Sequence, residues 1–276
     1  MTTTTAVHVA GRLPSTLRLG ISRGGVEIRM FFRQRMAVVF VFALPAILLA
    51  LFGSIFNETR NGVTQGQLMT GGLVAAGLAS TSFLNMGIGI AQDRDDRTLK
   101  RLRGTPISAV SYFLGKVVLV AVASLAETIL LLAVGVLFFH VTLPHTAARW
   151  VTFGWVFVLG VAGCTLLGIA ASGMARSARS APAVLNLIFL VLEFMSGVFI
   201  VPITTLPRWM VDIASFFPLK WTAQGMRSVF LPDGMMSLEE AGTWEQGRTA
   251  LVLGAWCLVG LALCLSTFRW TSRRDR

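Results

Sequence analysis

Six stretches of about 20 predominantly apolar residues dominate this sequence, and each is long enough to cross a bilayer core about 30 Å thick. They span residues 36–56, 69–91, 117–139, 150–174, 183–201 and 250–268. Hydrophobic residues make up 54% of the chain and charged residues only 13%, whereas soluble domains carry about 25% charged residues. A disordered chain is excluded as well, because such chains are poor in hydrophobic residues. We therefore predict an all-α membrane protein with six transmembrane helices.

The charges between these stretches predict the orientation. With the N-terminus inside, the inner segments hold 18 Lys and Arg against 5 Asp and Glu, whereas the outer segments hold 6 of each kind. Because Lys and Arg collect in cytoplasmic loops, we expect a multi-pass protein of the cell membrane with both termini in the cytoplasm. The net charge of +11 is then explained by orientation and by contact with anionic lipid in the bilayer. Nucleic-acid binding is left without support.

The segment before the first stretch has its own pattern. Residues 1–12 are Thr-rich and are expected to be flexible, with no cleavable signal peptide. Residues 13–35 place apolar side chains on one side of a helix and arginines on another, which is typical of an amphipathic helix in the inner interface. Two roles stay open for this helix, a simple membrane anchor or a lever against a cytoplasmic partner. At the other end, residues 269–276 form a basic cytoplasmic tail.

Residues 92–108, between the second and third stretches, combine both signs of charge. Asp93, Asp95 and Asp96 come first, and basic residues that include Arg101 follow. Acidic residues early and basic residues late suit the dipole of a helix, and Leu99 and Leu102 add a small apolar ridge. A solvated loop that only obeys the positive-inside bias is the alternative. It leaves the three aspartates unexplained, so we predict a short cytoplasmic helix that docks on another protein.

The outer segment from 202 to 248 is too long to be a connection without structure of its own. Pro207 begins a helical pattern that Pro218 ends, and a second pattern runs to Phe230. Because bare irregular backbone cannot face lipid, we predict a re-entrant pair of helices packed on protein before the last span.

These features together resemble the permease subunits of type-2 ATP-binding-cassette exporters, including daunorubicin-type drug efflux permeases. The resemblance rests on the six-span plan with its preceding amphipathic helix and on the acidic-then-basic stretch that ends in a Thr-Pro-x-Ser pattern at residues 105–108. It also rests on the run Ser196 to Pro202, on Leu206-Pro207-x-Trp209 and on Phe217-Pro218-Leu219, with Arg227 downstream. The match covers roughly residues 20–270. The sequence departs from the resemblance at the coupling turn, where Arg97 stands in a place that the family often gives to Gly.

The resemblance implies that this chain works with other subunits. ATP and Mg would be bound by a separate ATP-binding subunit, present in two copies, because this sequence contains no phosphate-binding G-x-x-x-x-G-K-[ST] loop. A second permease subunit would complete the complex as a homodimer or a heterodimer. The residues implied to couple to the ATPase are Asp93, Arg94, Asp95, Asp96, Leu99, Arg101 and Leu102.

Four polar residues lie within the predicted spans, namely Asn85, Glu127, Asn186 and Glu193. Polar groups inside a bilayer are costly and usually face a bundle interior or a cavity. Three roles stay open for the two glutamates: hydrogen bonds between helices, the lining of a substrate path or a dimer-interface cavity, and proton coupling. Asn186 and Glu193 are seven residues apart on one helix face, which we expect to point into the bundle or at a cavity.

Enzyme chemistry finds little support in this sequence. The three histidines and three cysteines share no metal-ligand spacing, and no nucleophile motif is present. We therefore predict no catalytic, cofactor-binding or metal residues and expect the chain not to be an enzyme. The main hypothesis is a permease subunit of an ATP-driven exporter that moves a hydrophobic or amphipathic substrate outward. The alternative is an ion- or proton-coupled secondary transporter that uses Glu127 and Glu193 as carriers.

Overall fold

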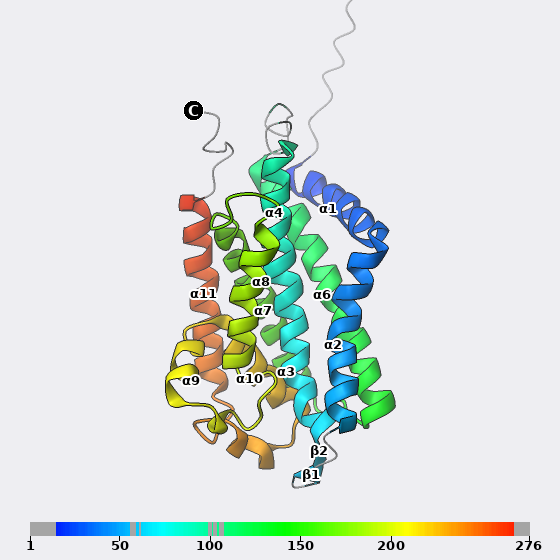
Figure 1. Cartoon of the computed structure of the whole chain (residues 1–276), viewed down its shortest axis with the longest axis vertical. Helices are drawn as coiled ribbons and strands as arrows, with labels where there is room; N and C mark the ends of the chain where they lie inside the picture. Colours follow the sequence, from blue (N-terminus) through cyan, green and yellow to red (C-terminus); the bar gives the residue numbers. More distant parts are fainter. Residues whose placement is uncertain are drawn as a thin grey trace, which may run out of the picture.

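A computed structural model describes residues 15–55, 59–60, 62–98, 101, 104 and 108–267. The predicted flexible start, residues 1–12, and the basic tail, residues 269–276, lie outside the described residues. Helices make up almost all of the described structure, as predicted, and a short β-hairpin of two two-residue strands interrupts them (Figure 1). In chain order the first elements are α1 (Thr16–Arg33), α2 (Arg35–Ile55), β1 (Thr59–Arg60), β2 (Val63–Thr64), α3 (Gln65–Ala79), the π-helix η1 (Ser80–Leu84) and α4 (Asn85–Asp95). The later elements are α6 (Ala109–Phe139), α7 (Ala147–Ala171), α8 (Ala181–Met195), η2 (Ile203–Thr205), α9 (Arg208–Ala214), α10 (Pro218–Phe230), η3 (Asp233–Leu238) and α11 (Gln246–Thr267).

Five helices in the described part of the chain are long and apolar enough to cross a membrane. They are α2, the continuous helix α3–η1–α4, α6, α7 and α11. The predicted span at 183–201 differs from the structure, because α8 has only 15 residues and ends at Met195. Gly197 follows with a φ of 67°, and this left-handed conformation terminates a helix. The hydropathy of the apolar residues after Met195 suggested that the span continues, although the helix has already ended there.

The helix α3–η1–α4 runs through the middle of the bundle (Figure 1). It begins with a capping box, in which Thr64 and Gln67 satisfy each other's backbone N–H groups. Thirteen of the fifteen residues of α3 are buried, because α2, α6, α7 and α10 all pack against this helix. The last turn of α4 carries Asp93 and Asp95 out of the apolar core.

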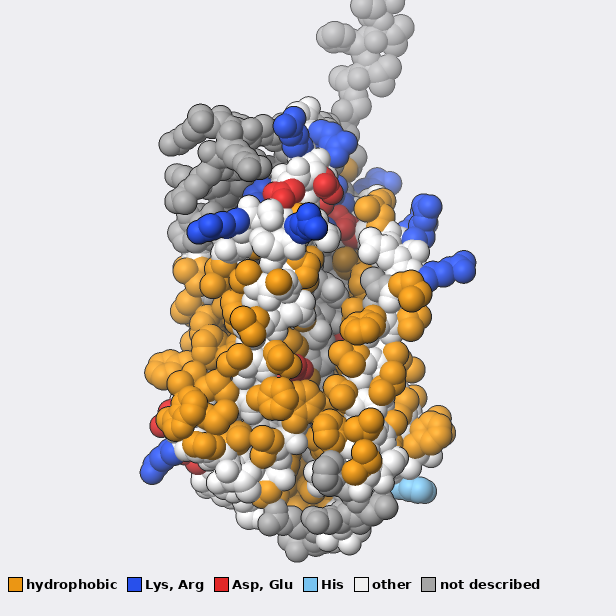
Figure 2. All heavy atoms as spheres, viewed as in Figure 1, with side chains coloured by type: hydrophobic (Ala, Val, Ile, Leu, Met, Phe, Trp, Pro, Cys, Tyr) orange, Lys and Arg blue, Asp and Glu red, His pale blue; other side chains and the backbone are white. Residues whose placement is uncertain are grey.

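The two ends of the bundle differ in charge and in structure. At the end that carries α1 and the last turn of α4, here called the basic end, Lys and Arg side chains gather, and hydrophobic side chains cover the flanks below them (Figure 2). The opposite end carries the β-hairpin, α9, α10 and η3 and is here called the hairpin end (Figure 1). A small hydrophobic cluster joins the elements there, made of Val63, Leu68, Leu231, Met235, Leu238 and Trp244.

Small residues let α7 approach its neighbours closely. A Cβ on Gly168 would lie 2.5 Å from the backbone oxygen of Phe83 in η1, and one on Gly160 would lie 2.9 Å from the Thr222 side chain in α10. Interfaces between membrane helices are enriched in small residues for this reason. The glycines of α7 therefore contribute to packing, and they position α10 inside the bundle.

Two glycines of α1 face α6 rather than lipid. A Cβ on Gly20 would lie 2.5 Å from the Leu114 side chain, and one on Gly24 would lie 2.7 Å from the Val118 side chain. The apolar side chains of Leu17 and Ile21 are more than half exposed on another face of the same helix. α1 is thus packed on protein through its glycines while it offers an apolar face to its surroundings.

Two adjacent glycines of α1 give a matched test of this packing. Gly24→Ala should destabilise the protein by about 1–3 kcal/mol, because the new methyl group overlaps Val118. Gly25→Ala should stabilise it by up to about 1 kcal/mol, because alanine favours the helix and nothing lies within 4 Å of the new Cβ. Unfolding titrations of the two variants in mixed micelles measure both effects, and equal effects would contradict the packing described here.

Candidate coupling site and intramembrane polar residues

A cluster of charged residues joins three helices at the basic end. Lys116 of α6 donates from Nζ to Glu27 Oε2 of α1 and to Asp93 Oδ2 of α4, each at 2.9 Å. Lys116 and Glu27 are both 8% exposed. One buried ammonium group therefore bridges carboxylates from two different helices, and we call these residues the three-helix ion cluster.

Two further side chains complete the three-helix ion cluster. Arg23 Nη2 donates to Glu27 Oε1 at 3.0 Å, and the Tyr112 hydroxyl donates to Asp93 Oδ2 at 2.7 Å. The Arg23 guanidinium also lies 5.1 Å from the centre of the Tyr112 ring, a favourable cation–π geometry. Two positive and two negative charges balance, which is the condition under which buried charges are tolerated.

The last turn of α4 is also tied to the loop between α7 and α8. Arg94 Nη2 donates to the backbone oxygen of Ala175 at 2.8 Å, and the backbone N–H of Ala178 donates to Asp95 Oδ2 at 2.5 Å. Asp93, Arg94 and Asp95 thus connect one helix end to α6 and to the loop between α7 and α8, and Lys116 extends the connection to α1.

These contacts correct the predicted coupling helix. Asp93 and Asp95 belong to the C-terminal turn of α4, not to the start of a separate helix, so the argument from the helix dipole was wrong for them. The chain turns at Asp96 and Arg97, where Arg97 has a φ of 57°. Glycine adopts this left-handed conformation most easily, so Arg97 holds a backbone position that suits Gly better.

The remaining predicted coupling residues divide into two groups. Asp96 is exposed, and Arg101 Nη2 donates to its backbone oxygen at 3.2 Å. Leu99 and Leu102 lie outside the described residues. The predicted leucine ridge therefore stays a prediction.

Glu127 lies deep in the bundle, with only 2% of its surface exposed. Thr81 of η1 donates to Glu127 Oε2 at 2.5 Å, whereas Oε1 has no hydrogen-bond partner. A Cβ on Gly77 would lie 2.6 Å from that free oxygen, so α3 passes directly beside it. The one bond that Glu127 makes joins α6 to the central helix, which fits the structural alternative among its three roles.

A second buried ion pair lies at the hairpin end. Arg227 of α10 donates from Nε and Nη2 to the two carboxylate oxygens of Glu239, at 2.6 and 3.2 Å, and both side chains are 1% exposed. Arg227 Nη1 also donates to the backbone oxygen of Gly197 at 3.0 Å. A Cβ on Gly71 of α3 would lie 2.9 Å from the backbone of Arg227. The pair therefore joins the turn after α8, α10 and the chain after η3 against the central helix.

Burial also changes the pKa of Lys220, a lysine of α10 near the Arg227–Glu239 pair. Desolvation lowers the pKa of Lys220, which is 2% exposed, and the charges of Glu239 and Glu245 oppose that shift. The Lys220 amino group lies 3.7 Å from the centre of the Trp221 ring.

No three His, Cys, Asp or Glu residues within the described ranges are placed to hold a metal ion together.

Comparison with known proteins identifies the region that contains these sites. Residues 26–231 match the family model of the ABC-2 type transporter membrane domain. The chain belongs to the ABC-2 type transporter family. Two curated relatives, both named "Putative transport permease ycf38", come from Porphyra purpurea, with 26% identity over 197 residues, and from Pyropia yezoensis, with 28% over 194 residues. Each alignment covers 67% of this chain and 65% of the relative, slightly less than two thirds of the relative's length.

Membership of this family settles two of the predictions. The matched region is the membrane permease domain of an ABC-2 type transporter, which confirms a multi-pass membrane protein. It also confirms that the chain is not an enzyme, because this domain is the non-catalytic membrane component.

The other polar residues of this permease lie differently from the prediction. The buried face of α8 consists of Ala181, Leu185, Phe189, Leu192 and Met195. Asn186 is exposed, and its amide donates to the backbone oxygen of Pro182 on the same helix. Glu193 and Asn85 are half-buried. Asn186 therefore does not point into the bundle, because the larger apolar residues occupy that face, and the other alternative, a position at a cavity, stays a prediction.

Four residues that matter in the permease were missed at the sequence level. Glu27 had a signal, because it is the one acid among the first 35 residues, on a helix rich in arginine. Lys116 and Glu239 had none that is local, because their partners Glu27 and Arg227 are 89 and 12 residues away along the chain. Tyr112 is the single tyrosine of the sequence, and this rarity was the one signal that could have drawn attention to it.

Proposed function

We propose that this permease is the membrane subunit of an ATP-driven exporter that moves a hydrophobic or amphipathic substrate, such as a drug, an antibiotic or a lipid-like molecule, out of the cell. A separate ATP-binding subunit, in two copies, binds ATP and Mg and supplies the energy. The family of the chain supports this role. The substrate class follows from the resemblance to drug efflux permeases.

One observation carries the coupling mechanism. The last turn of α4, at Asp93 to Asp95, bonds to α6 and to the loop between α7 and α8, and Lys116 of α6 links it to α1. A displacement of the following segment, residues 96–108, would therefore reach the central helix α3–η1–α4, α6, α7 and α8 through these polar contacts, without passing through the apolar core. This arrangement supports residues 96–108 as the contact with the ATPase and α1 as a lever that moves with them.

The arrangement of the helices supports six crossings rather than five. α2 begins and α11 ends at the basic end of the bundle (Figure 1), which requires an even number of crossings. α8 supplies the sixth, although its 15 residues span only about 22 Å at 1.5 Å per residue. The Lys and Arg side chains at the basic end support a cytoplasmic location of that end and of both termini.

Polar groups on the outer face of α8 support a second permease subunit. Asn186 is exposed and Glu193 is half-buried on a helix whose other exposed residues are all apolar, Leu187, Leu190 and Phe194 among them. Polar side chains in the bilayer face protein or a water-filled cavity rather than lipid. Pairing of two permeases through α8 would cover this face and place Glu193 beside the interface.

Asp96 gives a test of coupling that leaves the fold intact. Its side chain is exposed and makes no hydrogen bond or ion pair within the described part of the chain. Asp96→Ala should lower ATP-driven transport by about tenfold, the effect of losing one charge-assisted contact with a partner. Thermal stability should stay unchanged. Gln92→Ala, at an exposed position on α4, is the matched control. Equal transport by both variants in the reconstituted complex would rule out this contact.

The family match weakens the alternative of a proton-coupled transporter. That alternative requires flux driven by a proton gradient through liposomes that contain this chain alone, with Glu127→Gln abolishing it. We expect no such flux, because within the described residues Glu127 forms no ion pair and accepts a hydrogen bond only from Thr81.

A further inference from the structure

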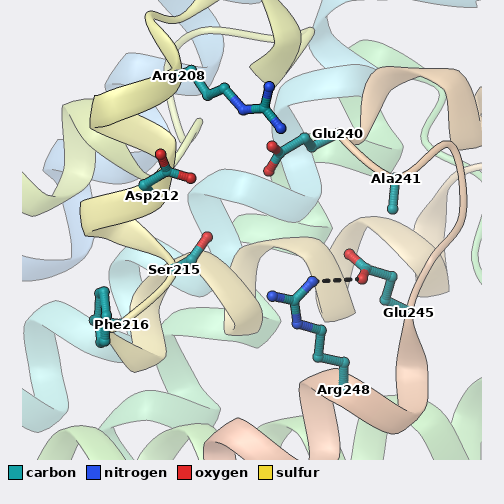
Figure 3. A pocket seen from close by; sticks show the side chains of 8 residues that line it. All are labelled: Arg208, Asp212, Ser215, Phe216, Glu240, Ala241, Glu245 and Arg248. Carbon is teal, nitrogen blue, oxygen red and sulfur yellow. Dashed lines mark hydrogen bonds and ion pairs between the residues drawn. The ribbon is translucent and has the colours of Figure 1, made fainter.

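A cavity of about 710 Å³ lies at the hairpin end, apart from the ion cluster and from the intramembrane glutamates. Its charged lining comes from three segments, α9, the loop after η3 and the first turn of α11 (Figure 3). The charged residues are Arg208, Asp212, Glu240, Glu245 and Arg248. Ligand sites in proteins have volumes of about 300–1,000 Å³, so this cavity is large enough for a small polar ligand.

Most of these charges have no partner. The side chains of Arg208, Asp212 and Glu240 make no hydrogen bond or ion pair within the described ranges, whereas Arg248 Nη1 donates to Glu245 Oε1 at 3.1 Å. Figure 3 shows Arg208 and Glu240 pointing toward one another without a bond, and the carboxylate of Asp212 beside them. The cavity therefore presents free positive and negative groups side by side.

The surroundings of the cavity are apolar. The side chains of Trp209 and Ile213 on α9, which supplies Arg208 and Asp212, are 60% and 43% exposed, and that of Phe216, just after α9, is 75% exposed. The lower left of Figure 2 shows charged side chains at this place bordered by hydrophobic ones. In a membrane protein such a surface lies at the boundary between acyl chains and headgroups, where aromatic residues are favoured.

We propose that this cavity binds the headgroup of a phospholipid that carries both a phosphate and a primary amine, as in phosphatidylethanolamine. Arg208 and Arg248 donate to the phosphate oxygens, since arginine forms paired bonds with phosphate. Asp212 and Glu240 accept from the ammonium group, which has three donors. The acyl chains lie along Trp209, Ile213 and Phe216.

The balance of charge favours this headgroup over its two main competitors. The lining holds two arginines and three carboxylates, so an anionic lipid such as phosphatidylglycerol meets a net negative site. Phosphatidylcholine carries the same charges as phosphatidylethanolamine, but its quaternary amine has no N–H to donate to Asp212 or Glu240. The site does not depend on the proposed export activity, since it requires only insertion in a bilayer.

The first experiment compares lipids on the unaltered protein. The full chain is purified in detergent, incubated with one lipid at a time and analysed by native mass spectrometry. We expect phosphatidylethanolamine to bind about tenfold more tightly than phosphatidylcholine or phosphatidylglycerol, the effect of one charge-assisted hydrogen bond. Soluble phosphoethanolamine should not displace it at equal concentration, because it lacks the acyl chains. Equal binding of the three lipids, or displacement by phosphoethanolamine, would overturn the proposal.

The second experiment assigns the binding to the cavity. Arg208→Ala and the pair Asp212→Asn with Glu240→Gln should each weaken phosphatidylethanolamine binding by about tenfold, while Arg208→Lys retains part of it. Asp233→Asn, at an exposed carboxylate outside the cavity, is the matched control. Unchanged binding by the cavity variants, or an equal loss in Asp233→Asn, contradicts the site.

Discussion

Replacing Lys116 by methionine should destabilise the permease by about 3–5 kcal/mol. The change removes the ammonium group between Glu27 and Asp93 and leaves two carboxylates facing each other at a site where Glu27 is 8% exposed. Breaking a buried ion pair by removing one partner carries this penalty. Unfolding titrations in mixed micelles measure the loss of stability. In the reconstituted complex, ATP hydrolysis should continue while transport falls, because α1 and α6 separate from α4.

A variant that also removes the two carboxylates gives the control. Lys116→Met combined with Glu27→Gln and Asp93→Asn leaves Arg23 as the one charge of the cluster, and its side chain is 20% exposed, so most of the stability should return. If transport stays low in that stable triple variant, the three-helix ion cluster acts in coupling and not only in folding. Equal stability of the single and triple variants would show that Glu27 and Asp93 can stay charged without Lys116 at no cost in stability.

The spanning helices could be predicted from the sequence because hydropathy is a local property. An apolar helix that crosses the bilayer needs no knowledge of its neighbours. α8 shows where this reasoning fails, since hydropathy continues to residue 201 while the backbone turns at Gly197. The conformation of one glycine, not the composition of the segment, ends that helix.

The candidate site was less accessible to prediction, because its partners are distant in the sequence. Asp93 was correctly noted as an acid without a topological purpose, but its partners Tyr112 and Lys116 belong to the next span. The argument from charge order placed Asp93 at a helix start, whereas it lies in the last turn of α4. The order of charges along a chain does not show whether a residue lies at the start of one helix or at the end of the preceding one.

The two ion pairs have comparable roles at opposite ends of the bundle. The three-helix ion cluster connects α1, α4 and α6 at the basic end. Arg227 and Glu239 connect α10 to the turn after α8 and to the chain after η3 at the hairpin end. Both contact the helix α3–η1–α4, one at Asp93 and the other at Gly71.

Replacing Arg227 by methionine should have a similarly large effect, a loss of about 3–5 kcal/mol of stability. Glu239 would keep its charge at 1% side-chain exposure without its paired donors, and the backbone oxygen of Gly197 would lose a hydrogen bond. Arg227→Lys keeps the charge but not the paired geometry, so an intermediate loss is expected. Unfolding titrations again measure these differences.

The exposed pair of Arg248 and Glu245 is the matched control for Arg227. Its N–O distance of 3.1 Å is similar, but the Arg248 side chain is 63% exposed, and exposed pairs contribute less than about 1 kcal/mol. Arg248→Met should therefore change stability little. Adding Glu239→Gln to Arg227→Met should recover part of the loss, because the buried charge disappears. If Arg227→Met and Arg248→Met lower the free energy of unfolding equally, burial does not determine how much the Arg227–Glu239 pair contributes to stability.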